Sequence, residues 1–323
     1  MYLIVSQKRD PLFNIAAEEF MLKQMAGDVI YFYVNNPSVI IGKHQNSYAE
    51  INYPFLRDRN IPLIRRLSGG GTVYHDQGNV NFSFVMDGEE GKLVDFRKFI
   101  NPIIHALGHL GLNVVYGGRN DLLLNGKKIS GNAEHVFKNR TLHHGTLLYS
   151  SNLDFLEESI RVKQGRFRDK AVQSVRSKVT NIQPHLQVKL SIHEFITHLS
   201  AEMMNYFKNC LPYTFTDLEI KEIKKLVTEK YSTWEWNYGY SPGYELTNTI
   251  NIDGKNSKIL ILVEKGIIRN IRIEPGYREL ENWVNRHLTG QNHEFKIIAE
   301  TIKGADFAPL KNLTDQDIIQ LFF

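Results

Sequence analysis

Cysteine is almost absent from this sequence. Cys210 is the only one among 323 residues, which excludes an intramolecular disulfide and a cysteine-rich metal site. It follows an apolar helical stretch, within Phe207-Lys208-Asn209-Cys210-Leu211-Pro212. That run is neither glycine-rich nor strongly basic, so we interpret Cys210 as a buried structural thiol rather than a nucleophile.

Long hydrophobic runs are also missing. No apolar stretch approaches the length that crosses a membrane. The first residues, Met1-Tyr2-Leu3-Ile4-Val5-Ser6, lack the charged leader, the apolar core and the cleavage signature of a signal peptide. We therefore expect a cytoplasmic protein with no membrane partner.

A large excess of either sign of charge is also missing. Lys and Arg number 39 against 35 Asp and Glu, which gives a formal net charge of +4. A general nucleic-acid binder usually carries a denser basic stripe, so no nucleic-acid partner is expected. The mild positive balance instead favours a local site for an anionic ligand. A hydrophobic share of 42% suffices for a packed core in one large domain or two.

The first two-thirds of the chain predict an α+β fold. Apolar spacing indicates a capped helix from Asp10, β-rich runs at 29–34 and 38–41, and a helix over 96–110. His105 and His109 lie on that last helix, where we expect solvated or capping roles rather than metal ligation. No His/Cys set has the spacing of a zinc site.

Two local patterns define strands near the middle of the chain. Asn81 and Ser83 alternate with apolar residues, which predicts a half-buried strand whose polar face is available to a ligand. Asn125-Gly126 between two β-type runs predicts a tight hairpin. Because the connections are short, strand pairing should be mostly antiparallel.

The remainder of the chain changes character twice. Residues 161–178 are crowded with Lys and Arg, which predicts a solvated loop or, beside a phosphate site, a lid. Residues 234–243 are rich in aromatic and turn-forming residues, which predicts a boundary between two domains. A three-strand meander over 246–273 and helices near 277–288, 294–303 and 314–323 should follow.

The most informative stretch runs from Arg65 to Asp76. Two arginines lead into the consecutive glycines 69–71, and a β-type segment follows. Glycines allow close backbone approach to a ligand, successive N–H groups form an anion-binding nest, and arginine adds donors for phosphate oxygens. The loop lacks the Gly-Lys-Ser/Thr ending of a P-loop, so attack at an α-phosphate fits better than γ-phosphate transfer.

Four clusters occur in one order along the chain: Arg65 to Asp76, Gly78-Asn79, Asn120-Asp121 with Lys128 to Ala133, and His143 to Leu147. Together they resemble the lipoate–protein ligase family of the bacterial lipoate-salvage type. The match rests on Arg-Arg-x-Ser-Gly-Gly-Gly-x-Val-x-His-Asp, Lys-x-Ser-Gly-x-Ala and His-Gly-Thr-Leu. Residues 174–181 and 234–239 also match, so the resemblance covers nearly the whole chain.

The resemblance implies a fold and a reaction. The fold is α+β, with a large mixed, mostly antiparallel-sheet catalytic domain of the biotin/lipoate ligase type at 1–243 and a small α+β accessory domain at 247–323. The reaction joins lipoate and ATP into lipoyl-adenylate, with release of pyrophosphate. A lysine of an apo lipoyl domain then takes the lipoyl group. Such partners are the acyltransferase subunits of 2-oxoacid dehydrogenases and the glycine cleavage H protein.

With this reaction in view, site residues can be predicted. ATP binding is expected at Arg66, Gly70, Gly71, Thr72, Val73, Tyr74, Asp121 and Lys128. Lipoate binding is expected at His75, Asn79, Lys128 and His144. The adenylate-binding loop would supply Lys163, Arg166, Arg168, Lys170 and Arg176. Lys128, which by analogy contacts both the lipoyl carbonyl and the α-phosphate, is the predicted catalytic residue.

One metal ion is expected, because Mg²⁺ normally bridges protein carboxylate and substrate phosphate. Asp121 is the candidate ligand for Mg²⁺, and a turn-capping role is the other reading of this residue.

Other functions remain open at this point. A lipoyl or octanoyl transferase between carrier proteins is one, although its cysteine-dependent form needs a thiolate that Cys210 does not suit. A variant that uses preformed lipoyl-adenylate is another, and biotin ligation is chemically parallel. A non-catalytic nucleotide or carrier-protein sensor is the reading from a different class.

Overall fold

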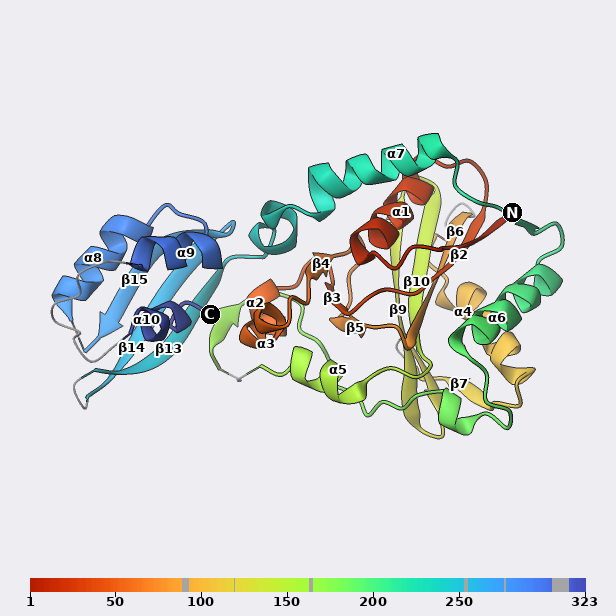
Figure 1. Cartoon of the computed structure of the whole chain (residues 1–323), viewed down its shortest axis with the longest axis horizontal. Helices are drawn as coiled ribbons and strands as arrows, with labels where there is room; N and C mark the ends of the chain where they lie inside the picture. Colours follow the sequence, from red (N-terminus) through yellow and green to blue (C-terminus); the bar gives the residue numbers. More distant parts are fainter. Residues whose placement is uncertain (89–92, 119, 163–164, 253–254, 276, 304–313) are drawn as a thin grey trace. The chain divides into compact units, whose positions relative to one another are not determined.

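The computed structural model describes residues 1–88, 93–118, 120–162, 165–252, 255–275, 277–303 and 314–323 (Figure 1). These residues form two compact units. The first consists of Met1–Lys43, Asn60–Ser159 and Ser174–Thr233, and the second of His44–Arg59, Ile160–Gln173 and Trp234–Phe323. None of the described helices is long and apolar enough to cross a membrane.

The first unit is built on an eight-stranded sheet with the order β12-β1-β2-β6-β10-β9-β8-β7. Its strands are β1 (Tyr2–Val5), β2 (Val29–Tyr33), β6 (Asn79–Asp87), β7 (Val114–Tyr116), β8 (Asp121–Leu124), β9 (Lys127–Phe137), β10 (Arg140–Leu148) and β12 (Leu211–Pro212). Strand β1 pairs in parallel with β2 and β12, and the other neighbours are antiparallel. The predicted mixed, mostly antiparallel sheet is confirmed.

Two helices, α4 (Phe96–Gly108) and α6 (Ile192–Tyr206), cover one face of this sheet (Figure 1). Asp95 caps α4 by accepting a hydrogen bond from the Lys98 N–H, and a capping box of Ser191 and Glu194 begins α6. Their apolar faces pack on alternate residues of the strands, so the main core lies between these helices and the sheet.

Helix α1 (Pro11–Lys23) contacts the opposite face of the sheet. The Asp10 side chain accepts a hydrogen bond from the Leu12 N–H, and Pro11 occupies the first turn, where a missing N–H costs nothing. The helix is buried almost all round, and Asn14 and Glu18 point at polar residues of the sheet. The strand over 79–87 is therefore buried on both faces, which corrects the predicted half-buried strand.

Shorter elements complete the first unit. A three-stranded sheet with the order β4-β3-β5 carries the chain into and out of the glycine run. The remaining elements are β3 (Ser38–Ile41), β4 (Leu63–Arg65), β5 (Val73–His75), α5 (Leu153–Ser159), the 3₁₀ turn η1 (Gln183–His185), α7 (Asp217–Leu226) and the π-helical turn η2 (Val227–Tyr231).

The second unit is a four-stranded antiparallel sheet with the order β11-β13-β14-β15 and several helices. Its elements are α2 (Ser47–Glu50), α3 (Tyr53–Asp58), β11 (Phe167–Asp169), the π-helical turn η3 (Glu235–Gly239), β13 (Tyr244–Ile252), β14 (Lys255–Glu264), β15 (Ile267–Glu274), α8 (Arg278–Leu288), α9 (Phe295–Ile302) and α10 (Asp315–Gln320). The predicted meander and its three helices are present.

Two features of the second unit differ from the sequence reading. The basic stretch contains a strand, β11, because its Phe167–Asp169 backbone pairs with β13. Residues 44–59 and 160–173 also belong to this compact unit, although they precede the predicted boundary at 243. A single cut in the chain does not describe the packing, and the functional division at 243–247 stays a prediction.

The core of the first unit can be tested with two leucines on helices. Leu199 on α6 is fully buried, whereas Leu218 on α7 is 70% exposed. We expect Leu199→Ala to lower the free energy of unfolding by about 2–5 kcal/mol, because it removes buried methyl groups and leaves a cavity. Leu218→Ala should change it by less than about 0.5 kcal/mol. Urea unfolding measures both, and equal effects would contradict the described core.

Candidate active site

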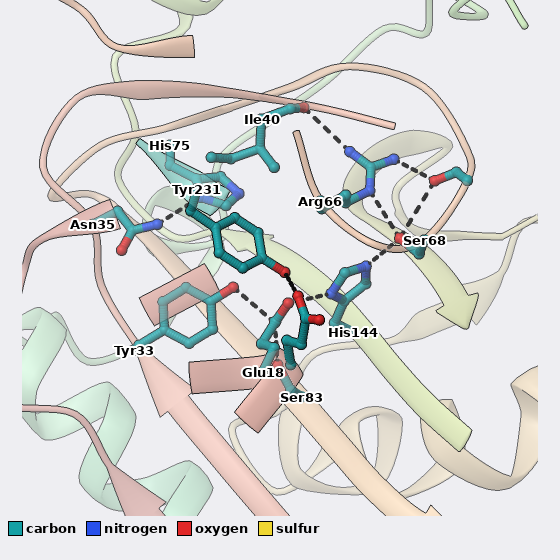
Figure 2. A network of polar contacts seen from close by, with 12 residues as sticks. Glu18, Tyr33, Asn35, Ile40, Arg66, Ser68, His75, Ser83, His144 and Tyr231 are labelled. Atoms are coloured by element: carbon teal, nitrogen blue, oxygen red, sulfur yellow. Dashed lines mark hydrogen bonds and ion pairs between the residues drawn. The ribbon is translucent and has the colours of Figure 1, made fainter. Parts of the chain in front are cut away.

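The glycine run is held in shape by the side chain of Arg66. Its Nε donates to Ser68 Oγ at 2.9 Å, and its Nη1 donates to the Ile40 carbonyl at 3.2 Å (Figure 2). Its Nη2 donates to the carbonyls of Gly69 at 2.6 Å and Gly71 at 2.8 Å. The rigid guanidinium fork therefore acts as a brace inside the loop.

Arg66 also places a positive charge beneath the loop. Its side chain is nearly inaccessible to solvent, and burial lowers the pKa of the guanidinium to about 10, against the opposing effects of Glu18 and Tyr33. The group is still charged at neutral pH. Hydrogen bonds from a charged donor are among the strongest in proteins, which offsets the cost of burying this charge.

Two glycines are required by the geometry of the loop. Gly70 has φ +86°, a region that residues with a side chain rarely adopt. A Cβ on Gly42 would lie 2.2 Å from the Gly70 carbonyl oxygen, so the chain after β3 passes directly against the loop. This close approach leaves no room for a side chain at Gly42 and restrains the backbone of the loop.

A buried hydrogen-bond chain connects the loop to the sheet and to α1 (Figure 2). Ser68 Oγ lies 2.6 Å from His144 Nε2, and His144 Nδ1 lies 2.8 Å from Glu18 Oε2. Because Ser68 Oγ accepts from Arg66, its own hydrogen is free to go to His144 Nε2. His144 then donates from Nδ1 to Glu18, and every member of the chain is satisfied.

Glu18 is the acceptor at the end of this chain. It also receives hydrogen bonds from Tyr33 at 2.9 Å and from Ser83 at 2.6 Å. Burial alone would raise the pKa of the Glu18 carboxyl, but His144, Ser83 and Tyr33 together lower it below the usual value. The carboxylate is therefore ionised and fixes the position of His144.

The neighbouring histidines His143 and His144 on β10 point to opposite faces of the sheet. His143 points into the core beneath α4, where its ring stacks on Phe99 with centroids 5.0 Å apart. Its Nδ1 lies 2.9 Å from Glu134. His144, which is predicted to bind lipoate, points to the α1 face, because successive side chains of a strand alternate between the faces of the sheet.

His75 and Asn79 both have a buried polar atom without a protein partner among the described residues, His75 Nε2 and Asn79 Oδ1. Asn35 Nδ2 donates to His75 Nδ1 at 3.0 Å, which leaves the hydrogen of the neutral ring on Nε2. Burial, with the positive charge of Arg66, lowers the pKa of His75 to about 3. The ring is thus a neutral donor available to a ligand oxygen.

Lys128 lies at the start of β9, just after the Asn125-Gly126 turn. Its Nζ is 2.8 Å from Asp121 Oδ1, and both side chains are about a quarter exposed, at 24% and 23%. The backbone at Lys128 is held by a second segment, because its N–H donates to the Lys178 carbonyl and its carbonyl accepts from the Thr180 N–H. The ammonium is therefore carried by a fixed backbone and remains accessible.

Residues 174–180 connect the lysine with the glycine run. Ser174 Oγ accepts a hydrogen bond from the Thr72 N–H at 2.9 Å, and Lys178 and Thr180 bond to Lys128. Four residues of chain span at most about 14 Å, so Thr72 and Lys128 border the same short segment. Strand β9 makes a second connection, because a Cβ on Gly70 would lie 3.7 Å from the Ala133 Cβ.

The predicted adenylate-binding residues are divided between the two units. Lys163 lies outside the described residues. Arg166 donates to Asn248 Oδ1 and to the Phe323 carbonyl within the second unit. Arg168 and Lys170 are exposed in that unit, whereas Arg176 belongs to the first.

Sequence reasoning missed two members of the hydrogen-bond chain. Ser68 is part of the glycine motif, but its partner His144 lies 76 residues further along the chain, so local patterns do not reveal the contact. Glu18 interrupts an apolar helix, since it follows Ala16-Ala17 and is itself buried. A carboxylate within an apolar stripe is the signal that was available, because buried acids require partners.

The residues of this site match a known family model. The description "Lipoyl protein ligase A/B catalytic domain" matches residues 10–204, which include α1, the glycine loop, Lys128 and His144. The chain belongs to this lipoyl protein ligase family.

Curated relatives cover nearly the whole chain. Lipoate-protein ligase 1 of Staphylococcus aureus is 38% identical over 92% of this chain and 92% of its own length. Lipoate-protein ligase LplJ of Bacillus subtilis is 36% identical over 97% of each chain. The likeness therefore extends beyond the catalytic-domain match into the second unit.

Solved structures of the lipoyl protein ligase family have the same fold. A bipartite lipoate protein ligase of Thermoplasma acidophilum, described with its E2 lipoyl domain, has a TM-score of 0.65 and 29% identity. The match covers 74% of this chain and 96% of the archaeal one. A lipoate-protein ligase A bound with ATP has a TM-score of 0.63 and 26% identity, over 74% and 98% of the two chains.

The buried, neutral state of His75 predicts a dependence of stability on pH. An unfolded histidine titrates near 6.5, so between that value and about 3 the unfolded chain binds one proton more than the folded one. The free energy of unfolding therefore falls as the pH drops below about 6.5. His75 accounts for about 2 kcal/mol of this loss at pH 5.

We expect His75→Gln to remove that part of the pH dependence. Urea unfolding at pH 7 and pH 5 should show a smaller loss in the variant, because the other buried histidines are common to both proteins. His193→Gln, at an exposed position on α6, is the control and should lose as much unfolding free energy between pH 7 and pH 5 as the natural chain does. Equal losses in all three proteins would show that His75 is not held neutral.

Proposed function

We propose that this chain is a ligase that activates lipoate with ATP and attaches it to proteins. In the first step the lipoate carboxylate attacks the α-phosphorus of ATP, a mixed anhydride forms and pyrophosphate leaves. In the second step the ε-amine of an acceptor lysine attacks the lipoyl carbonyl, AMP leaves, and the amine loses a proton. The observation that carries this proposal is that the glycine loop and Lys128 border one segment, 174–180.

The first step brings two anions together, so the site must supply positive charge in a fixed arrangement. Arg66 supplies a buried cation within the loop, and Gly70 has the positive φ that an N–H nest requires. All the hydrogen-bonding nitrogens of Arg66 already contact the loop, Ser68 or Ile40. Its predicted part in ATP binding is therefore through its charge and through the shape of the loop.

Lys128 is the proposed catalytic residue. Its ammonium would stabilise negative charge on the α-phosphate in the first step and on the lipoyl carbonyl oxygen in the second. Asp121 Oδ1 lies 2.8 Å from this ammonium, and both side chains are partly exposed. Substrate oxygens would take the place of the Asp121 oxygen.

Asp121 fits a role in holding Mg²⁺. It offers a partly exposed carboxylate, the hard oxygen ligand that this ion takes from proteins alongside substrate phosphates. The ion, when bound with ATP, would neutralise phosphate charge. Asp121, released from Lys128 by the substrate oxygens, would hold and orient the ion.

The lipoyl chain is assigned to the α1 face of the sheet. His75 supports this assignment with its unpartnered Nε2–H, and Asn79 with its unpartnered Oδ1. His144 has both ring nitrogens committed to Ser68 and Glu18, so it would present the face or edge of its ring to the ligand. Val73 and Tyr74 continue the loop into β5, where they would border the nucleotide.

Lipoyl domains are the proposed acceptors. The archaeal relative described with its E2 lipoyl domain supports this class of partner. We extend it to the acyltransferase subunits of 2-oxoacid dehydrogenases and to the glycine cleavage H protein. The basic residues Arg166, Arg168, Lys170 and Arg176 are assigned to the adenylate-binding loop, and the reaction to the cytoplasm.

The role of Lys128 gives the most direct mutational prediction. Lys128→Ala should lower the rate of lipoyl-adenylate formation by about 10²–10³-fold, because it removes the cation at the reacting centre. Lys127→Ala is the matched control, since Lys127 is the exposed neighbour on the same strand. Pyrophosphate release with lipoate and ATP measures the first step. Normal release from a folded Lys128→Ala protein would refute the assignment.

A thiol-dependent acyltransferase is the competing function, and Cys210 tests it. Cys210 lies in the main core, and burial raises the pKa of its thiol, so a reactive thiolate is disfavoured. We expect Cys210→Ser to retain ligase activity within a few-fold. Intact mass of an apo lipoyl domain, incubated with enzyme, lipoate, ATP and Mg²⁺, measures the product. Loss of product in a folded variant would favour the thiol mechanism, and product formed without ATP would favour a transferase.

A further inference from the structure

A cluster of metal-ligating side chains lies on the α4–α6 face of the first unit, away from the α1 face. His105 and His109 are one helical turn apart at the end of α4, and Glu202 faces them from α6. One ligand atom from each residue lies within 4.8 Å of the other two. We propose that these residues bind a divalent transition-metal ion, Zn²⁺ in preference to Mg²⁺ or Ca²⁺, and that the ion links α4 to α6.

The distances suit a small coordination sphere. His109 Nδ1 is 2.7 Å and His105 Nδ1 is 3.8 Å from the same oxygen, Oε2 of Glu202. Ligands around tetrahedral zinc at about 2.0–2.1 Å stand about 3.3 Å from one another. The two measured distances lie on either side of that spacing, so the ligand atoms are already close to the arrangement that zinc takes.

A simple hydrogen bond explains only part of this arrangement. The contact of His109 with Glu202 satisfies that carboxylate oxygen without His105. His105 nevertheless directs its own Nδ1 toward the same oxygen of Glu202, and the two imidazole centroids are 4.3 Å apart. Two imidazoles and one carboxylate that converge on one point are the donor set that zinc prefers.

The helices hold the three side chains in a rigid frame. Ile103 and Leu107 of α4 share the main core with Leu199 and Met203 of α6. His198 Nε2 lies 2.9 Å from the Ala106 carbonyl, which makes a further contact between the helices close to the cluster. The separation of the ligands is therefore set by core packing rather than by the exposed side chains.

The electrostatic setting also favours a cation. His105 is in the last turn of α4, His109 is its C-cap, and Glu202 lies near the C-terminal end of α6. The carbonyl ends of both helices carry partial negative charge. The histidine side chains are 49% and 53% exposed, so an ion can enter from solution and retain a water molecule as its fourth ligand.

Metal titration of the untagged full-length chain, freed of metal with a chelator, tests the proposal. Competition with a chromogenic zinc indicator should give one Zn²⁺ per chain, and Co²⁺ should give the intense visible bands of a tetrahedral site. His105→Ala, His109→Ala and Glu202→Gln should each weaken binding by at least about tenfold. His193→Ala removes another exposed histidine of α6 and should leave the affinity unchanged.

Thermal unfolding supplies an independent readout. Zn²⁺ should raise the melting temperature of the natural chain and of His193→Ala, because the ion binds the folded state, but not that of His109→Ala. Equal melting temperatures in chelator would show that the variants are folded. If a variant fails to fold, Glu202→Gln, which keeps the shape of the side chain, decides the result. Equal zinc affinity in the natural chain and the ligand variants, or no binding to the natural chain, would overturn the proposal.

Discussion

The site depends on the burial of one positive charge. Arg66 places its guanidinium inside the glycine loop, and each of its three nitrogens donates to the backbone or to Ser68. An unpaired buried charge would be costly, so the loop is stable in this shape only while its carbonyls face inward to Arg66. Its other side is then left to a ligand, and the positive φ of Gly70 follows from the same turn.

The same charge organises the layers around the loop. From Arg66 the hydrogen bonds pass through Ser68 and His144 to Glu18, and so from the loop to β10 and α1. Glu18 is the anion that balances Arg66 within this network, and Tyr33 and Ser83 donate further hydrogen bonds to its carboxylate. A preorganised polar network of this kind supplies charge stabilisation without reorganisation when a reaction occurs.

Family membership and local structure were accessible from the sequence for different reasons. Helix α1, the Asn125-Gly126 hairpin and the C-terminal meander depend on local patterns, namely a cap, a turn dipeptide and alternation. The ordered motifs predicted the family, and the match of the family model to residues 10–204 confirms it. The mostly antiparallel sheet followed from short connections, and the structure confirms it.

Features that depend on distant contacts were not accessible. The strand over 79–87 was predicted to be half-buried with its polar face available to a ligand, but α1 packs on that face, where Glu18 and Asn14 satisfy polar groups of the sheet. Strand β11 forms only because β13 offers it an edge. The contact between His109 and Glu202 was not accessible either, because the two residues are 93 positions apart, whereas the predicted exposure of His105 and His109 is confirmed.

The central claim is that the braced glycine loop and Lys128 face the same acyl–phosphate junction. A crystal structure with a non-hydrolysable lipoyl-adenylate analogue tests it most directly. The account predicts the Lys128 ammonium at about 2.7–3.2 Å from both the acyl oxygen and a phosphate oxygen, with Arg66 still bonded to Gly69 and Gly71. An analogue bound away from the loop, with Lys128 still paired to Asp121, would contradict it.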